Sequence, residues 1–146
     1  MSAFTPAEIK YLQSQRLGRI ATVGRDGQPH VVPVGFRYNP EYDTVDIGGH
    51  DFAKRKKYRD VQRNPRVAFV VDDVKSFVLW RVRGVEVRGE AEILETGGET
   101  VIRFFDPEMF RIHPTQVVSW GLEQNDTPGN TRTFMSQLIR RLLHQR

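Results

Sequence analysis

The stretch Leu17-Gly-Arg-Ile-Ala-Thr-Val-Gly-Arg-Asp-Gly-Gln-Pro-His-Val-Val-Pro-Val-Gly-Phe36 is typical of a β-hairpin. Residues 18–23 are short and β-prone, and residues 30–38 form the expected return strand. Between them, Asp26-Gly27 is a frequent hairpin-turn pair. Because proline cannot donate to a β-ladder, Pro33 predicts that the return strand lies at a sheet edge or carries a bulge.

The rest of the chain predicts more strands and a few short helices. The expected strands are residues 44–47, 67–71, 77–82, 85–93 and 116–120, and the expected helices are residues 5–15, 52–63, 99–105 and 133–144. Residues 67–71 are continuously apolar, as in a strand buried on both faces. Residues 85–93 alternate, as in an antiparallel strand with one exposed face, and Gly84 is expected to mark a bulge or a bend where the phase of the alternation changes. Since strands and helices do not alternate, a small closed or nearly closed β-barrel of six to seven mostly antiparallel strands fits best.

Length and composition predict one domain over residues 1–146 with a substantial core, in which residues 131–146 add a C-terminal helical extension. No apolar run is long enough for a membrane-spanning helix, and the first residues do not have the pattern of a signal peptide. We therefore expect a cytoplasmic protein. The sequence contains no cysteine, which excludes disulfides, thiol nucleophiles and cysteine metal sites.

The main charged feature is a basic cluster. Seven of the 22 Lys and Arg residues fall between positions 54 and 66, against one acid, Asp60. Such a cluster after the Gly48-Gly49 turn suits an anion, most often a phosphate, and points to a nucleotide or a phosphorylated cofactor. A solvated basic helix face is the alternative. The net charge of +4 also fits nucleic acid, but Tyr58 is the only aromatic beside the cluster, and stacking on single strands needs several.

Other chemistry is disfavoured by the absence of its motifs. The chain has no G-x-G-x-x-G, no P-loop and no G-x-S-x-G elbow. Its four histidines lack the spacing of a metal site, so no metal is expected and no catalytic residue is nominated. A protein with an anion site and few proton-transfer groups can let a cofactor carry the reaction.

Several motifs in order resemble a known superfamily. They are the hairpin above, Arg55-x-Lys57 after the glycine turn, Asn64-Pro-Arg-Val-Ala68, Val85-Glu-Val-Arg-Gly-Glu-Ala91 and Val117-Val-Ser-Trp-Gly-Leu122. Residues 5–123 resemble the pyridoxamine 5′-phosphate oxidase-like split β-barrel superfamily. Within it, they are most similar to the actinobacterial flavin/deazaflavin oxidoreductases that use coenzyme F420.

This resemblance implies a homodimer with two cofactor sites at the subunit interface. It implies that the flavin-like ring lies against the strand around residues 31–34 and that basic residues bind the cofactor phosphate. Trp120 would either close the site, from its own or from the partner subunit, or pack in the dimer core. Asp60 departs from the asparagine that is frequent in relatives. The residues assigned to cofactor binding in this way are Val32, Pro33, Val34, His50, Arg55, Lys56, Lys57, Arg59 and Trp120.

The leading functional expectation is an F420-dependent reductase that transfers hydride to a small electron-poor organic acceptor. The alternatives are an FMN-dependent oxidoreductase of the same fold and a non-catalytic protein that binds a flavin, a deazaflavin or a tetrapyrrole. The dense run of cations at residues 54–57 favours F420, which carries several carboxylates besides its phosphate, over FMN. The C-terminal helix is expected to act either as a structural cap or as a lid over the substrate pocket.

Overall fold

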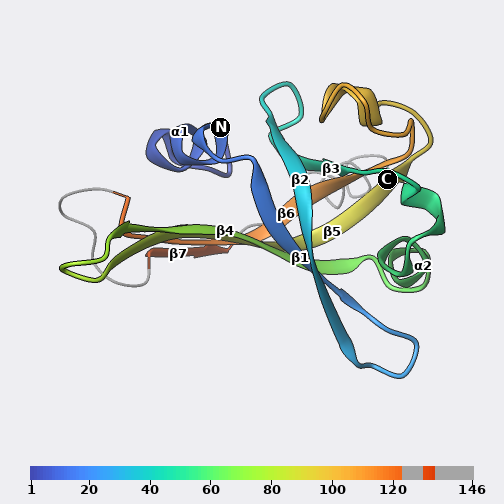
Figure 1. The fold of residues 1–146 in the computed structure, drawn as a ribbon, viewed down its shortest axis with the longest axis horizontal. Coiled ribbons are helices and arrows are strands. Elements are labelled where there is room, and N and C mark those ends of the chain that lie inside the picture. The colour runs from blue at the N-terminus through green and yellow to red at the C-terminus, as the bar shows by residue number, and fades with distance from the viewer. Residues whose placement is uncertain (123–129, 134–146) are drawn as a thin grey trace.

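The computed structural model describes residues 1–122 and 130–133, and antiparallel strands dominate it (Figure 1). The helices are α1 (Pro6–Ser14) and α2 (Lys56–Arg63), with short 3-10 helices η1 (Phe52–Lys54) and η2 (Gly98–Thr100). The strands are β1 (Leu17–Val23), β2 (Pro29–Asn39), β3 (Thr44–Gly48), β4 (Arg66–Ser76), β5 (Arg81–Leu94), β6 (Met109–Trp120) and β7 (Asn130–Thr133). The helix expected after Thr133 lies outside the described residues.

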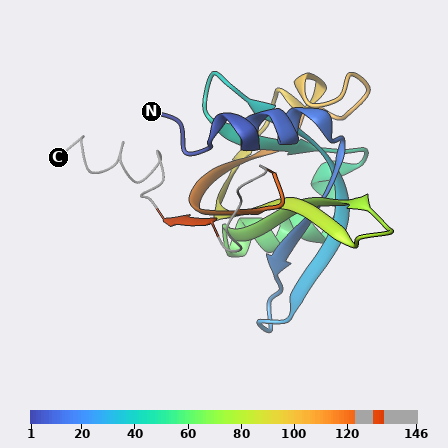
Figure 2. The ribbon, with the colours of Figure 1, turned by 90° about the vertical axis from the view of Figure 1, so that its left-hand side faces the viewer.

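The strands close into a barrel. They follow the order β3-β2-β1-β4-β5-β6-β7, and a further pairing between β3 and β6 joins the ends of the first six strands. All pairings are antiparallel, so the predicted mainly β split barrel is confirmed. β7 extends the sheet beside the far part of β6. Figure 2 shows α1 lying across one end of the barrel.

Local signals position the first helix as predicted. The Thr5 hydroxyl accepts a hydrogen bond from the Glu8 amide at 3.2 Å, and a Glu8 carboxylate oxygen accepts one from the Thr5 amide at 2.8 Å. This capping box satisfies two amides at the helix start. Tyr11 and Leu12 are buried against the barrel, so α1 covers part of the core.

The core is one cluster inside the barrel. Ile20, Phe36, Phe69 and Val85 are buried in it. Residues 85, 87, 89 and 91 of β5 face inward and alternate with less buried residues, as predicted. Residues 67–71 lie in strand β4, as predicted, but burial on both faces was wrong, because β4 also alternates and only every second side chain is fully buried.

Two elements were placed wrongly from the sequence. Residues 77–80, expected to be part of a strand, form the exposed turn between β4 and β5. The segment expected to be a helix over 99–105 contains only η2 and turns. In both cases apolar side chains suggested a regular element, although the backbone there changes direction.

Two further predictions, which concern β5 and β6, are corrected by the structure. Gly84 stands in regular register with Asp72 of β4 and Trp120 of β6. The register shifts lie between Val74 and Ser76 in the β4–β5 ladder and between Arg88 and Gly89 in the β5–β6 ladder. A Cβ at Gly84 would lie 2.5 Å from Trp120 Cζ2, so the glycine makes room for the indole. The last predicted strand, residues 116–120, is the second half of the longer β6.

Pro33 lies at an edge, as predicted. β2 pairs with β1 from Pro29 to Gly35, but its pairing with β3 begins only at Gly35. Residues 29–34 therefore have a ladder on one side only among the described residues. In an antiparallel ladder alternate residues direct their N–H and C=O groups away from a given neighbour, so this part of β2 offers free backbone groups.

Within the described residues, neither helix combines the length and the apolar character needed to cross a bilayer.

Candidate functional site

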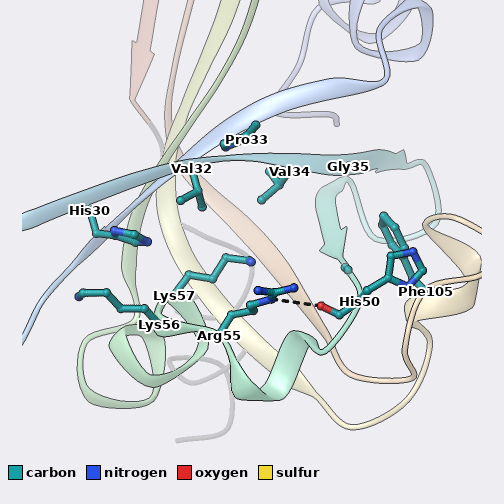
Figure 3. Close-up of a pocket in the computed structure, with 12 residues that line it drawn as sticks. His30, Val32, Pro33, Val34, Gly35, His50, Arg55, Lys56, Lys57 and Phe105 are labelled. Carbon is teal, nitrogen blue, oxygen red and sulfur yellow. Dashed lines mark hydrogen bonds between the residues drawn. The ribbon is translucent and has the colours of Figure 1, made fainter.

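A cavity of about 530 Å³ lies beside this open part of β2, between it, the end of β3 and the start of α2 (Figure 3). Seven of the residues predicted to bind a cofactor line the cavity: Val32, Pro33, Val34, His50, Arg55, Lys56 and Lys57. Segments separated by some twenty residues are thus brought to one place, as the prediction requires. Their role in binding a cofactor stays a prediction.

The floor of the cavity is the beginning of α2. Arg55 is its N-cap residue and breaks the predicted basic helix into η1 and α2. Lys56 and Lys57 follow in the first turn. The amides of a helix start and the positive end of its dipole favour an anion. Three cationic side chains therefore surround a position that already attracts negative charge.

Arg55 and Lys57 are the cations most available to a ligand. Arg55 Nε donates a hydrogen bond to the His50 carbonyl at 3.3 Å, and the terminal guanidinium nitrogens make no hydrogen bond to the described residues. Lys57 Nζ lies 5.2 Å from the centre of the Phe52 ring. Burial lowers the pKa of Lys57 below its usual 10.5, and the positive charge of Arg55 lowers it further. A bound anion would favour the charged form of Lys57 and so counteract this lowering of the pKa.

Lys56 has an acid partner. Its Nζ lies 3.0 Å from both carboxylate oxygens of Asp60, which is fully buried and also accepts hydrogen bonds from Thr22 and Arg63. Burial by itself would raise the pKa of Asp60, but the hydrogen bonds from Lys56, Thr22 and Arg63 outweigh it and keep the pKa below its usual value. Asp60 therefore anchors α2 on β1 and neutralises part of the basic cluster.

The opposite wall comes from β2. Figure 3 shows Val32 and Val34 directed toward Arg55 and Lys57, and the Pro33 ring on the other face of the strand. Val34 is buried, whereas Val31, next to the wall, is 65% exposed. The cavity thus has an apolar wall with free backbone groups facing a cationic floor, and no carboxylate of the described residues lines it.

Five lining residues were not among the predicted set: His30, Gly35, Gly48, Gly49 and Phe105. His30 and the three glycines lie within two residues of predicted residues in the sequence, so their proximity was a usable signal. Phe105 comes from the distant β5–β6 connection, and its ring contacts the His50 ring edge-on at 5.4 Å. Only the tertiary fold brings Phe105 to the cavity.

Two predicted residues do not line the cavity. Arg59 points its Nη1 to the Lys54 carbonyl at 2.9 Å. Trp120 ends β6 and packs over Gly84. No group of three or more His, Cys, Asp or Glu residues arranged for a metal occurs in the described part of the chain.

The fold and this cavity define a class: split β-barrels with a cationic cavity at a strand edge. A family model described as pyridoxamine 5′-phosphate oxidase matches residues 4–133. The chain therefore belongs to the pyridoxamine 5′-phosphate oxidase family.

Individual relatives agree with this assignment. A 5a,11a-dehydrotetracycline/5a,11a-dehydrooxytetracycline reductase from Streptomyces rimosus is 46% identical over 126 residues, which cover 86% of this chain and 89% of that protein. A solved FAD-binding protein from Mesorhizobium loti is 26% identical, with a TM-score of 0.58 over 80% of this chain and 91% of its own. A solved F420 reductase shares the fold, with 24% identity and a TM-score of 0.61 over 78% and 98% of the chains. The 46%-identical reductase supports an oxidoreductase, and the solved structures support the fold.

Proposed function

We propose that this protein is a reductase that binds coenzyme F420 in the cavity beside β2 and reduces a small electron-poor organic acceptor. The observation that carries the proposal is that two different surfaces face each other across the same cavity. On one side lie Arg55 and Lys57, which have no acid partner among the described residues, and on the other lies the open edge of β2. A phosphate suits the cationic floor, and a flat ring with polar edges suits the wall formed by β2.

The residues present fit such a cofactor. Guanidinium and ammonium groups are the side chains that hold phosphate most strongly. Val32 and Val34 offer apolar surface to one face of a ring, and the free backbone groups of β2 can bond to the ring's edge. When bound, the reduced deazaflavin supplies a hydride to the acceptor.

The chain's own contribution is binding, orientation and exclusion of water. Arg55 and Lys57 fix one end of the cofactor, so that the ring is held against β2 at a constant depth. Holding two reactants face to face at contact distance removes much of the entropic barrier. Backbone N–H groups at the β2 edge would stabilise negative charge that develops during transfer.

The acceptor we propose is a conjugated alkene, such as an enone or a quinone. The 46%-identical relative is named for reduction of dehydrotetracyclines, in which "dehydro" denotes the carbon–carbon double bond that reduction saturates. We extend this class of acceptor, not that particular compound, to the present chain. We also propose that the protein works as a homodimer.

FMN is the second candidate cofactor, and one observation favours it. Because Asp60 neutralises Lys56, the floor of the cavity holds fewer free cations than the run at residues 54–57 suggests. A single phosphate needs fewer charges than a phosphate with a chain of carboxylates. The 26%-identical relative is described as FAD-binding, which is compatible with a flavin.

The deciding experiment is a fluorescence titration of the purified protein with F420 and, in parallel, with FMN. Lys57→Ala should weaken binding of the true cofactor by about tenfold, equivalent to about 1.4 kcal/mol, because a charge-assisted contact is lost. Lys10→Ala is the matched control, since Lys10 is exposed on α1 and does not line the cavity.

Each result has a definite meaning. Preferential F420 binding that Lys57→Ala weakens and Lys10→Ala leaves unchanged supports the proposal. Tighter FMN binding moves the protein to the flavin branch. Binding without oxidation of the reduced cofactor by a panel of enones and quinones would make the protein a carrier, and binding of neither cofactor would refute both assignments.

A further inference from the structure

Strand β2 changes its partner at Gly35, and this leaves the strand with two open edges. Residues 29–35 pair with β1, and residues 35–39 pair with β3. The first half of β2 is therefore open on the side away from β1, where the cavity described above lies. The second half, residues 36–39, is open on the side away from β3, because its ladder with β1 ends at Gly35 among the described residues.

A second pocket, of about 270 Å³, lies at this other open edge. Residues from the end of α1, from β2 and from the connection between β5 and β6 line it, and none of them lines the first cavity. Its volume lies just below the range of about 300 to 1,000 Å³ that is usual for sites of drug-sized ligands, so it suits a smaller molecule.

The larger part of this lining is apolar. Four of the lining side chains are buried, those of Leu12, Phe36, Tyr38 and Val101. The Tyr38 hydroxyl donates a hydrogen bond to Asp43 at 2.6 Å, so that its ring, and not its polar end, is available to a ligand. The pocket can therefore take up the apolar body of a small molecule.

Arg37 is the only charged residue of the described chain that lines this pocket, and its guanidinium makes no ion pair there. The strand register explains why. Asp46 stands opposite Arg37 on one side and opposite Arg111 of β6 on the other. Arg111 donates two hydrogen bonds to the Asp46 carboxylate, at 3.2 and 3.3 Å, and Asn39 and Thr44 donate to it as well. The acid that would neutralise Arg37 across the strands is thus engaged elsewhere.

The end of α1 determines where an anion can lie in the pocket. The last turn of α1 contains no basic residue, and the C-terminal end of a helix carries partial negative charge. Gln13 and Gln15 add only neutral amides from this end. The positive charge of the pocket is therefore confined to the side of β2, at Arg37.

We infer that this pocket is a second ligand site, which binds a small carboxylic acid with an apolar body. Arg37 holds the carboxylate through paired, charge-assisted hydrogen bonds, for which the guanidinium has the right geometry. Alternate residues of the open edge direct N–H groups away from β3 and supply a further donor. The four buried side chains cover the apolar body. This inference concerns a site distinct from the first cavity and does not rest on the proposed function.

The two pockets differ in the charge that they select. The first cavity is lined by three cations at the start of a helix and suits a phosphate. The second has one cation, with the negative end of α1 close by, and suits a single negative charge. A phosphate dianion would gain less at Arg37 than a carboxylate does, because the helix end repels the additional charge.

Benzoate is the probe for this site, because it joins one carboxylate to a flat apolar ring. Benzyl alcohol keeps the ring without the charge, and acetate keeps the charge without the ring. Calorimetric titration of the wild type should give a dissociation constant for benzoate at or below about 1 mM, a reasonable affinity for so small a ligand. Benzyl alcohol and acetate should both bind at least tenfold more weakly.

Substitutions locate the bound probe. Arg37→Gln should weaken benzoate binding at least tenfold, to the level of benzyl alcohol, with an unchanged circular dichroism spectrum. Arg25→Gln is the matched control, since it removes the same charge from the exposed β1–β2 turn and lines neither pocket. Lys57→Ala, which removes a cation from the first cavity, should also leave benzoate binding unchanged.

Several results would overturn the inference. Equal affinity for benzyl alcohol would show an apolar pocket that does not recognise a carboxylate, and equal affinity for acetate would show attraction to a surface charge alone. A loss in Lys57→Ala or Arg25→Gln as large as that in Arg37→Gln would place the anion elsewhere, and a wild-type dissociation constant above about 1 mM would mean that no such site exists. None of these titrations contains F420 or FMN, so this inference and the proposed function can fail independently of each other.

Discussion

The charge of the Lys57 side chain in the cavity depends on pH. Burial lowers the pKa of its ammonium group below 10.5, and Arg55 adds to the shift. Below the lowered pKa the group is charged and attracts an anion, and as pH rises through that pKa the attraction is lost. An anionic ligand favours the charged form, so its binding should be accompanied by proton uptake near that pH.

We therefore predict that cofactor affinity falls with rising pH already below 10.5, where an unperturbed lysine would still be charged. In Lys57→Arg the guanidinium stays protonated throughout, so its affinity should change less over the same range. The measurement is the dissociation constant from pH 7 to pH 10 for both proteins. Parallel curves would show that another group controls binding.

Asp60 should contribute mainly to stability. Asp60→Asn removes a buried charge that accepts hydrogen bonds from Lys56, Thr22 and Arg63. We expect a loss of about 2 kcal/mol of unfolding free energy at pH 7. Because the folded-state pKa of Asp60 is lowered, its contribution is complete above the ordinary value of 3.8 and is lost as pH falls through the folded value. Urea unfolding of both proteins should give a difference at pH 7 that shrinks below pH 3.8. A difference that does not change with pH would contradict this account.

Among the secondary-structure elements, β5 depends on a close contact with β6. A methyl group at Gly84 would lie 2.5 Å from Trp120 Cζ2 and 2.9 Å from the Val71 carbonyl oxygen, so the indole or a strand must move. We predict that Gly84→Ala costs about 2 kcal/mol of unfolding free energy, as overpacking does. Gly49→Ala is the control, because its nearest neighbour is 3.4 Å away. Thermal unfolding of the two variants should differ by several degrees, and equal midpoints would refute the packing argument.

The sequence predicted those elements whose signals are local. The helix with Thr5 and Glu8 and the hairpin around Asp26-Gly27 were predicted within one or two residues of their bounds. Residues 77–82 and 99–105 were not, because apolar content indicates burial against something but not against what. At the site, neighbouring cations and one strand could be predicted together, whereas the contribution of Phe105 depends on a connection about fifty residues away.

Over the whole molecule, charge is distributed unevenly. The net charge is +4, but Asp60, Asp72 and Asp73 each pair with an arginine or a lysine in the described part of the chain, while Arg55 and Lys57 face the cavity. The attraction felt by a polyanionic ligand should therefore come from the site and not from the net charge.

Salt dependence tests this distinction. Between 50 and 500 mM salt, over which the Debye length falls from about 14 Å to about 4 Å, F420 should lose more affinity than FMN because it carries more charge. Lys57→Ala should flatten the dependence for F420, whereas Lys10→Ala, which changes the net charge equally, should leave it unchanged. Titrations at four salt concentrations would show the slopes, and equal slopes for the two variants would favour a net-charge effect.

The connection between β5 and β6 that carries Phe105 takes no part in the strand pairing of the barrel. Its described backbone contacts include Gly98 N–H to the Pro107 carbonyl at 2.8 Å and Asp106 N–H to the Gly49 carbonyl at 3.0 Å. Since the cost of closing a loop rises slowly with its length, residues between these two ties can be exchanged or inserted without disturbing strand pairing. The scaffold therefore separates folding from the shape of the cavity wall: libraries confined to residues 99–104 should leave the barrel intact while they change the surroundings of Phe105 at the cavity.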